Sequence, residues 1–312
     1  MSQEINTANS VHAGKNEGKP RASRSPFRQT IAALLADKLA LVGIVVVAIM
    51  IVAAVLAPVI APQNPYDLSQ LDILDGRLPP GSESMSGPVY LIGTDDQGRD
   101  LLSAILYGLR TSILVGISSA AIALVIGSSI GLMSAYAGGR VDSVLMRVVD
   151  IQLSFPAILI ALIFLAILGQ GVDKIILALV VTQWAYYART IRGSALVERK
   201  RAYVDAARSM ALPDSRILFR HILPNCLPPL IVVATMRVAY AIMLEATLSF
   251  LGIGLPITEP SLGLLISNGF EYLLSGDYWI SFFPGLALLV LIVAINLIGD
   301  SLRDILNPRR EG

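Results

Sequence analysis

The stretch YVDAARSMALPDSRILFRHILPN, Tyr203–Asn225, is a polar connection between two long apolar runs of a very hydrophobic chain. It opens with a segment of high helix propensity around Asp205. Pro213 should end that segment, because proline supplies no backbone donor to a helix. A second short helix is predicted over 216–222, and Pro224 is expected to end it before the next apolar run. The stretch is therefore predicted to fold as an elbow of two short helices.

The second helix of this predicted elbow is amphipathic. Ile217 and Ile222 lie on one side, and Arg216 and Arg220, four residues apart, share the other. Eight basic residues occur across 189–220, which is also typical of an ordinary cytoplasmic loop in a membrane protein. Composition by itself favours the ordinary loop, so the distinction depends on the order of the residues.

The composition indicates a membrane protein. Hydrophobic residues make up 54% of the 312 residues and charged residues only 15%, whereas soluble domains carry about 25% charged residues. A net charge of +1 gives no reason to expect nucleic-acid binding. With one cysteine and two histidines, an internal disulfide is excluded and no His/Cys metal site is expected.

Six apolar stretches are long enough to cross a bilayer, which takes about 20 residues. Backbone groups in hydrocarbon must be satisfied within the segment, so these stretches should be helices, and the alternating pattern of a barrel is missing. The predicted fold is an all-α, polytopic membrane protein with six transmembrane helices: Leu39–Ala61, Ser112–Ala137, Val144–Leu168, Ile175–Ala195, Leu227–Leu251 and Ile280–Leu302.

The distribution of Lys and Arg predicts the orientation. With the N-terminus inside, nineteen basic residues fall on the inner side and four on the outer side, as the positive-inside rule requires. Both termini and the elbow are therefore expected in the cytoplasm. The expected division of the chain is a disordered tail (1–27), a first span with an external segment (28–104), a five-helix core containing the elbow loop 196–226 (105–302), and a cytoplasmic C-terminal tail (303–312).

Several polar residues lie within the predicted spans. Arg237 is near the middle of the fifth, where a charge costs at least about 2.5–3.5 kcal/mol, so it should face the bundle interior and have a partner. Glu245 lies eight residues on, about 80° around and about 12 Å along an ideal helix, too far to pair directly. Asp150 or a carboxylate of the solute are other possible partners. These two acids, Arg237 and Gln183 are candidates for internal pairing or for the translocation path.

The order of residues in the elbow resembles the EAA loop of permease subunits in bacterial ABC importers. That pattern has Glu-Ala-Ala, three residues, Gly, and later Leu-Pro. This chain departs from it twice, with Asp for Glu and Ala for Gly. The resemblance implies that the loop carries a coupling helix that docks on an ATPase subunit. The matching positions are Asp205, Ala206, Ala207, Ala211, Leu223 and Pro224.

Other segments are similar to the peptide/nickel branch of that family, in a form closest to the C-type permease subunit of dipeptide and oligopeptide importers. Thr258–Leu265 departs from the usual pattern, and this leaves the solute open. The resemblance covers about residues 30 to 310, and its further motifs are Ile92–Asp100, Tyr107–Ser112, Glu245–Gly252, Pro284-Gly285 and Asn296–Asp304.

The resemblance also implies partners and a location. They are a second, homologous permease subunit, two ATPase subunits that hold ATP and Mg²⁺, an extracytoplasmic solute-binding protein, and the bacterial inner membrane. The cargo would be di- or oligopeptides, with nickel chelates, glutathione or opines as alternatives. This chain would hold no cofactor, since it contains no GxxxxGK[ST] loop.

Two other classes of protein are weighed against this one. An ion-driven secondary transporter typically has repeated halves and paired intramembrane acids, and no repeat is found in the sequence. A hydrolase is suggested by the string Gly299–Leu302, which spells GDSL, but neither His12 nor His221 follows it to act as a base. No catalytic residue is therefore expected.

Overall fold

The computed structural model describes residues 26–67, 69, 71–84, 87 and 89–306. The expected N-terminal tail thus lies almost wholly outside the described residues, as do positions 307–312 of the expected C-terminal tail. The helices are α1 (Pro26–Ala36), α2 (Lys38–Ile60), α3 (Leu101–Ala137), α4 (Gly139–Ser154), α5 (Ala157–Leu168), α6 (Val172–Glu198), α7 (Ala202–Ser209), α8 (Asp214–Arg216), α9 (Leu223–Phe250), α10 (Leu262–Phe270) and α11 (Trp279–Ile305).

The shorter elements connect these helices. Two-residue strands β1 (Ser82–Glu83) and β2 (Val89–Tyr90) pair antiparallel in the segment between α2 and α3. Single 3₁₀ turns occupy Ile73–Asp75 and Leu273–Ser275, and a π-helical turn, Ile217–Ile222, lies between α8 and α9. The described part of the chain is therefore mostly helical, as predicted, with one minimal hairpin.

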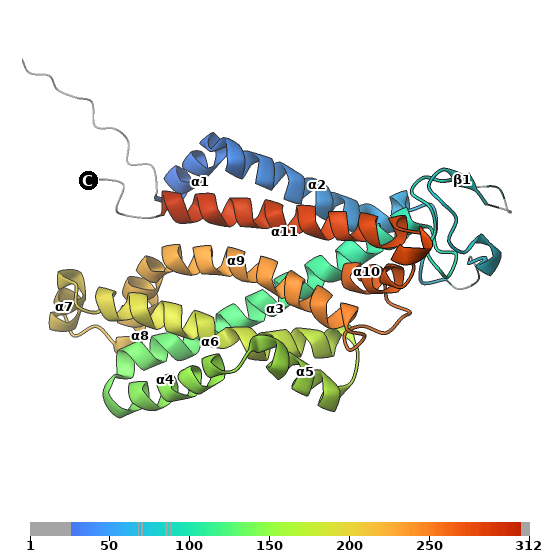
Figure 1. The fold of residues 1–312 in the computed structure, drawn as a ribbon. Coiled ribbons are helices and arrows are strands. Elements are labelled where there is room, and N and C mark those ends of the chain that lie inside the picture. The colour runs from blue at the N-terminus through green and yellow to red at the C-terminus, as the bar shows by residue number, and fades with distance from the viewer. Residues whose placement is uncertain (1–25, 68, 70, 85–86, 88, 307–312) are drawn as a thin grey trace, which may run out of the picture.

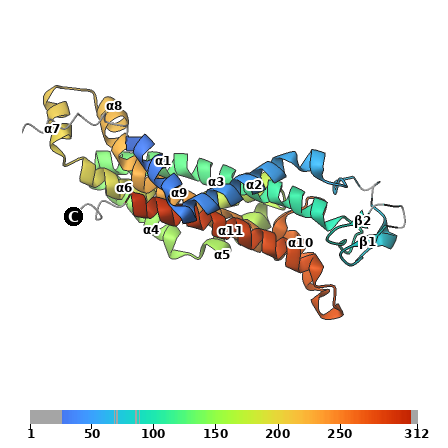
Figure 2. The same cartoon turned by 90° about the horizontal axis from the view of Figure 1, so that it is seen from above.

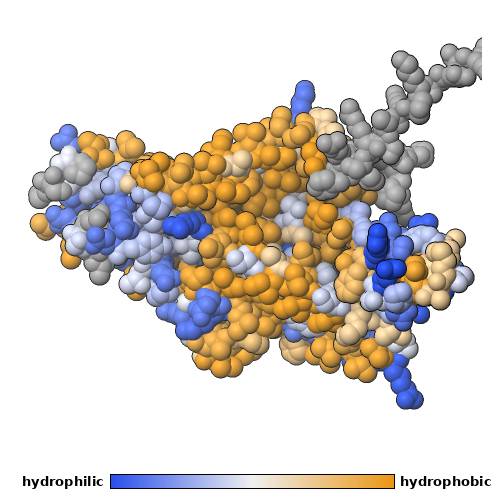
Figure 3. All heavy atoms as spheres, turned by 180° about the vertical axis from the view of Figure 1, so that it is seen from behind, coloured by the Kyte–Doolittle hydropathy of each residue, from blue (hydrophilic) through white to orange (hydrophobic). Residues whose placement is uncertain are grey.

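The long helices lie side by side in one bundle (Figures 1 and 2). The elbow of α7 and α8, the helix α1 and the end of α11 gather at one end of the bundle (Figure 1). The β1–β2 hairpin and α10 lie at the other end. An apolar band covers the middle of the molecule between two more polar ends (Figure 3), which is the surface pattern of a protein that spans a bilayer.

Four of the described helices are long and apolar enough to cross a membrane. They are α2, α3, α11 and a continuous helical segment of 37 residues, Asp214–Phe250, that contains α9. The pair α4 and α5 gives a fifth apolar segment, but its two halves are bent by 89°. Helix α6, which holds the predicted fourth span, is 27 residues long and is not in this set. Arginines, a glutamine and tyrosines along it lower its mean hydropathy.

The sequence predicts one helix over Val144–Leu168 with a kink at Pro156, and the structure instead divides this span into two helices. Val144–Leu168 is divided at Phe155-Pro156, where α4 ends and Pro156 becomes the N-cap of α5. Proline cannot donate its backbone nitrogen to the preceding turn and disfavours a helical conformation in the residue before it. Pro156 therefore indicates where the span is broken, but the sequence does not indicate the angle between the two halves.

Helix α3 begins eleven residues before its predicted start at Ser112. Asp100 caps it, and the Asp100 carboxylate accepts hydrogen bonds from the backbone nitrogen of Ser103 (2.8 Å) and the Ser103 hydroxyl (2.6 Å). This side-chain cap satisfies one of the free donors of the first turn. The first turns of α3 are buried by the segments around them, including Leu262 of α10.

Helices α3 and α6 approach each other closely. A Cβ atom added at Gly127 would lie 2.2 Å from the carbonyl oxygen of Trp184, and one at Gly131 would lie 2.2 Å from that of Ala188. Only glycine permits two backbones to approach so closely. The two glycines, four residues apart, therefore serve packing within the subunit.

At the opposite end from the elbow, a buried ion pair organises the loop before α3. Asp95 accepts hydrogen bonds from the backbone nitrogen and the Nε of Arg99, at 2.9 and 2.6 Å. Arg99 also donates to the carbonyl of Ile257 (3.4 Å), and Trp279 donates from its indole to the carbonyl of Thr94 (3.3 Å). These bonds tie the loop to the segment after α9 and to α11.

Candidate functional site

The elbow consists of α7, a tight turn, α8 and the π-helical turn that continues into α9. Helix α7 ends in a Schellman motif, in which the backbone nitrogen of Leu212 donates to the carbonyl of Ala207 (3.2 Å) and that of Ala211 donates to Arg208 (2.9 Å). Pro213 follows and begins the second arm. The two-helix elbow and its break at Pro213 are as predicted.

The second arm does not end at Pro224, and that part of the prediction is wrong. The chain remains helical from Asp214 to Phe250. The wider π turn Ile217–Ile222 ends two residues before Pro224, and such a turn relaxes the helix where its hydrogen-bond ladder is interrupted. The second arm of the elbow is therefore continuous with α9.

The inner side of the elbow is packed into the bundle. Val204 and Ala207 of α7 and Ile217 and Ile222 of the π turn are all almost fully buried. They share one apolar cluster with residues from the ends of α3, α6 and α9, namely Leu132, Ala135, Ile191, Ala195 and Cys226. A displacement of the elbow would therefore carry the ends of three long helices with it.

A tyrosine ties the first arm to the helices on either side of the elbow. The Tyr203 hydroxyl donates to the Glu198 carboxylate at the end of α6 (2.6 Å). It accepts from the side-chain amide of Asn225 in α9 (3.1 Å). Burial, and then the bond to Glu198, raise the pKa of Tyr203 to about 12. The hydroxyl thus stays protonated and keeps its donor role at any physiological pH.

The outer side of the elbow is exposed. The Asp205 side chain is 67% exposed and lies 3.7 Å from Arg208, an ion pair too open to hold the carboxylate strongly. Ala206 and Ala211 are also exposed. Ala207 is the one member of the predicted triplet that is buried, while Leu223 and Pro224 lie in the first turn of α9.

Two exposed apolar side chains on the elbow are missing from the residues predicted for this site. Met210 at the end of α7 and Phe219 on the π turn are 67% and 62% exposed. The available signal in the sequence was an apolar residue within a stretch that is otherwise polar and charged.

The polar residues of the membrane region do not form one cluster. Asp150 pairs with Arg189 (2.5 Å). The buried Glu245 accepts from the hydroxyls of Ser112 and Ser249, both at 2.8 Å. Thus neither acid weighed as a partner of Arg237 pairs with it.

Two further polar side chains of this region lie on α6 and α9. Gln183 is fully buried, and its amide atoms have no hydrogen-bond partner among the residues that the structure describes. The Arg237 guanidinium lies over the Tyr186 ring, 3.4 Å from the ring centroid. The contact of Arg237 is therefore aromatic.

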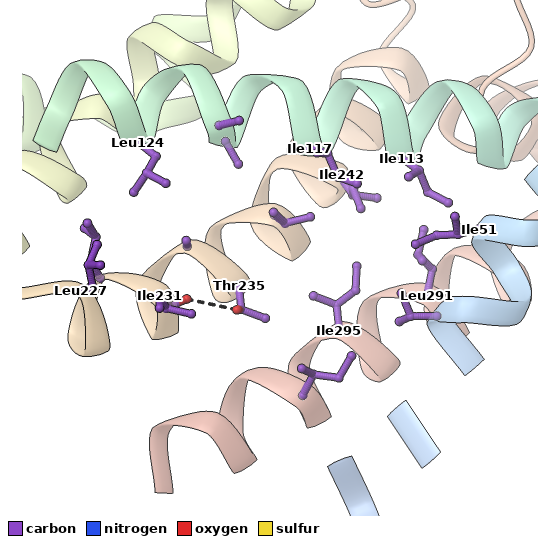
Figure 4. Close-up of a pocket in the computed structure, with 17 residues that line it drawn as sticks. Ile51, Ile113, Ile117, Leu124, Leu227, Ile231, Thr235, Ile242, Leu291 and Ile295 are labelled. Atoms are coloured by element: carbon purple, nitrogen blue, oxygen red, sulfur yellow. Dashed lines mark hydrogen bonds between the residues drawn. The ribbon is translucent and has the colours of Figure 1, made fainter. Parts of the chain in front are cut away.

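A crevice of about 420 Å³ lies between α2, α3, α9 and α11 (Figure 4). Its walls are aliphatic, with Thr235 as the polar exception. The Thr235 hydroxyl donates to the carbonyl of Ile231 (3.1 Å), one turn earlier in the same helix. The crevice is thus better suited to hydrocarbon than to a polar solute.

Comparison with known proteins gives two family matches. Residues 123–312 match the family described as binding-protein-dependent transport system inner membrane component. Residues 25–80 match the N-terminal TM domain of oligopeptide transport permease C. Together these matches cover most of the chain.

Several curated proteins are similar over nearly their whole length. A putative peptide transport system permease protein of Brucella abortus is 43% identical over 290 residues, which is 93% of this chain and 94% of that protein. The dipeptide permease DppC of Haemophilus influenzae is 37% identical, with 92% and 96% covered. The oligopeptide permease OppC of Bacillus subtilis is 34% identical, with 96% and 95% covered.

Among solved structures, a chain of the MetNI methionine ABC transporter, in an inward-facing conformation, has a similar fold. It matches with a TM-score of 0.54 at 22% identity, over 65% of this chain and 96% of that one.

Proposed function

This chain belongs to the family of binding-protein-dependent transport system inner membrane components, and from that premise we propose that it is the C-type permease subunit of an ATP-driven peptide importer. The observation that supports this mechanism is the structure of the elbow. Its outer side carries the exposed Asp205, and its inner side packs against the ends of three long helices. An elbow packed in this way can pass a displacement on to the three helices.

The elbow is proposed to dock on an ATPase subunit that holds ATP and Mg²⁺. Asp205 and Ala206 of α7, with Met210 next to them, would form the contact, because they are the exposed residues of the first arm. When ATP binding closes two ATPase subunits on each other, the elbow would move as a lever. The ends of α3, α6 and α9 would follow, and the path would open outward.

The orientation proposed is N-in and C-in, with six spans counted by including α6 and the bent pair α4–α5. The elbow, α1 and the end of α11 lie at one end of the bundle (Figure 1), which is the arrangement that this orientation requires. The membrane is proposed to be the bacterial inner membrane. A second permease subunit would supply the other half of the path, and an extracytoplasmic binding protein would deliver the solute.

Peptides are the proposed cargo, because relatives that match over nine-tenths of this chain or more are described as dipeptide and oligopeptide permeases. Nickel chelates, glutathione and opines remain alternatives within the same family. Mass spectrometry of the ligand that copurifies with the binding protein encoded alongside would distinguish them.

Charge reversal at Asp205 tests the coupling role. In proteoliposomes holding the whole transporter, Asp205→Lys should lower uptake per ATP hydrolysed by about tenfold or more, since placing a like charge in a docked interface costs several kcal/mol. Membrane insertion should be unchanged. Asp205→Glu, which restores the residue usual in this pattern, should keep uptake coupled to hydrolysis.

Glu83→Lys provides the matched control, because it reverses a charge on the hairpin at the far end of the bundle. It should leave uptake per ATP unchanged. Normal coupled uptake by Asp205→Lys would refute the proposed role of the elbow. Uptake by this chain without any ATPase subunit would instead indicate a secondary transporter.

A further inference from the structure

Arg237 differs from Arg189 and Arg192, two arginines of the neighbouring helix α6. It lies in the middle of α9, at the fifteenth of 28 positions, where a charge should face the interior of a bundle or a water-filled path. Arg189 and Arg192 each have a carboxylate partner, at 2.5 Å, in Asp150 and Asp142. No described residue provides a carboxylate or any other hydrogen-bond acceptor to Arg237.

The surroundings of Arg237 are aromatic. Its guanidinium carbon lies 3.4 Å from the centroid of the Tyr186 ring on α6 and 5.2 Å from that of Tyr240 on α9. All three side chains are partly exposed. Tyrosine faces attract a cation without neutralising it, so the charge is held in place while its planar set of N–H donors stays available.

Helix α9 thus has two different faces at this depth. Thr235, Val238 and Ile242 line the aliphatic crevice of Figure 4. Arg237 is not among the residues that line this crevice, and it contacts Tyr186 of α6 instead. The guanidinium of Arg237 therefore lies on the α6 side of α9, away from the crevice that suits hydrocarbon.

We propose that Arg237, Tyr186 and Tyr240 form a site on the translocation path for the carboxylate of the solute. A guanidinium can hold a carboxylate through two parallel hydrogen bonds, and every unmodified peptide carries one α-carboxylate. Because the Arg237 guanidinium is held in place without a carboxylate partner in this chain, it can bind the carboxylate of a passing solute and release it again. This inference rests on the proposed function and names the group of the solute that the path recognises.

The test compares free peptides with their C-terminal amides. The probes are alanyl-alanine and trialanine, each as acid and as amide, taken up by proteoliposomes that contain the whole transporter with its binding protein. The rate of each variant is divided by the wild-type rate for the same probe, which removes any preference of the binding protein. Arg237→Gln should lower this ratio about tenfold or more for the acids and much less for the amides, because a charged hydrogen-bonded pair is lost only for the acids.

Three further variants separate this role from a structural one. Arg189→Gln removes a cation that already has a partner in the chain, so it should affect acids and amides equally. Arg237→Lys keeps the charge but not the planar pair of donors and should fall between wild type and Arg237→Gln. Tyr186→Leu should also reduce the discrimination. ATPase stimulation by the liganded binding protein should remain within about twofold in all variants, as no charge on the elbow is changed.

Other results would overturn the site. Equal loss for acids and amides in Arg237→Gln would show a structural role, such as pairing with an acid of the second permease subunit, and unchanged uptake would show no role. If Arg237→Gln fails to assemble, the same ratio measured with Arg237→Lys and Tyr186→Leu decides between these results. Absence of ATP-driven uptake of all four probes by the wild type would refute the peptide importer itself.

Discussion

At the scale of the residue, Ala211 shows what the elbow requires. The sequence pattern that this loop resembles has glycine at that position, and size alone would make alanine an adequate replacement. The structure places Ala211 at a φ of +54°, as the left-handed residue that ends α7. The need for glycine is therefore conformational, because this backbone geometry costs an L-residue about 1–2 kcal/mol.

Ala211→Gly should consequently stabilise the protein. Relief of the backbone strain is partly offset by roughly 0.5–1 kcal/mol of added chain entropy in the unfolded state, so a net gain of up to about 1 kcal/mol is expected. The apparent melting temperature in detergent should rise. Ala206→Gly provides the control, since the same change inside the right-handed helix α7 should cost about 1 kcal/mol. A lower melting temperature for Ala211→Gly would contradict this account.

At the scale of the element, the bundle depends on the contact between α3 and α6. Gly127 and Gly131 bring the backbone of α3 against the carbonyls of α6, and α6 in turn carries Tyr186 toward Arg237. Helix α6 is the least apolar of the predicted spans, and it is shielded by this close packing. The position of a polar helix inside the bundle is thus set by small residues on its neighbour.

Gly127→Ala should disrupt this pair. The added methyl group would meet the Trp184 carbonyl and the Tyr187 side chain at sub-van der Waals distances, and forcing extra volume into a packed contact costs about 1–3 kcal/mol. Gly193→Ala is the matched control, as its added Cβ on α6 meets nothing within 4 Å and should be neutral or slightly stabilising. Thermal unfolding in detergent measures both variants. Equal melting temperatures would mean that the two helices can separate without cost.

At the scale of the whole molecule, the two ends of the bundle differ in structure. The elbow lies at one end and the β1–β2 hairpin, α10 and the turn after it lie at the other (Figure 1). Asp95 and Arg99 hold the hairpin end together from within. If the elbow meets an ATPase, the opposite end must face the delivered solute, so the orientation is itself a functional prediction.

Single cysteines at the two ends test this orientation. Leu274 is fully exposed beyond α10 and Met210 is 67% exposed on the elbow, while the native Cys226 is buried. A membrane-impermeant maleimide should label Leu274→Cys in intact inner-membrane spheroplasts. In the chain expressed without its ATPase subunits, which leaves the elbow uncovered, the reagent should label Met210→Cys only after the membrane is opened, and wild type should give only a low background. The reverse pattern would invert the proposed topology.

The sequence by itself determined the helical class, the central positions of the long apolar helices, the break at Pro156 and the two-arm elbow at Tyr203–Asn225. These features depend on local properties, namely runs of apolar residues, prolines and the alternation of burial along a short helix. The tertiary structure decided the rest. The 89° bend between α4 and α5, the continuity of the elbow with α9, the early start of α3 and the aromatic contact of Arg237 each depend on which segments meet in space. The physical reason is that hydropathy measures only how a single residue partitions between water and an apolar medium. It does not tell which residue becomes its neighbour, and Tyr186, which contacts Arg237, lies about fifty residues away on another helix.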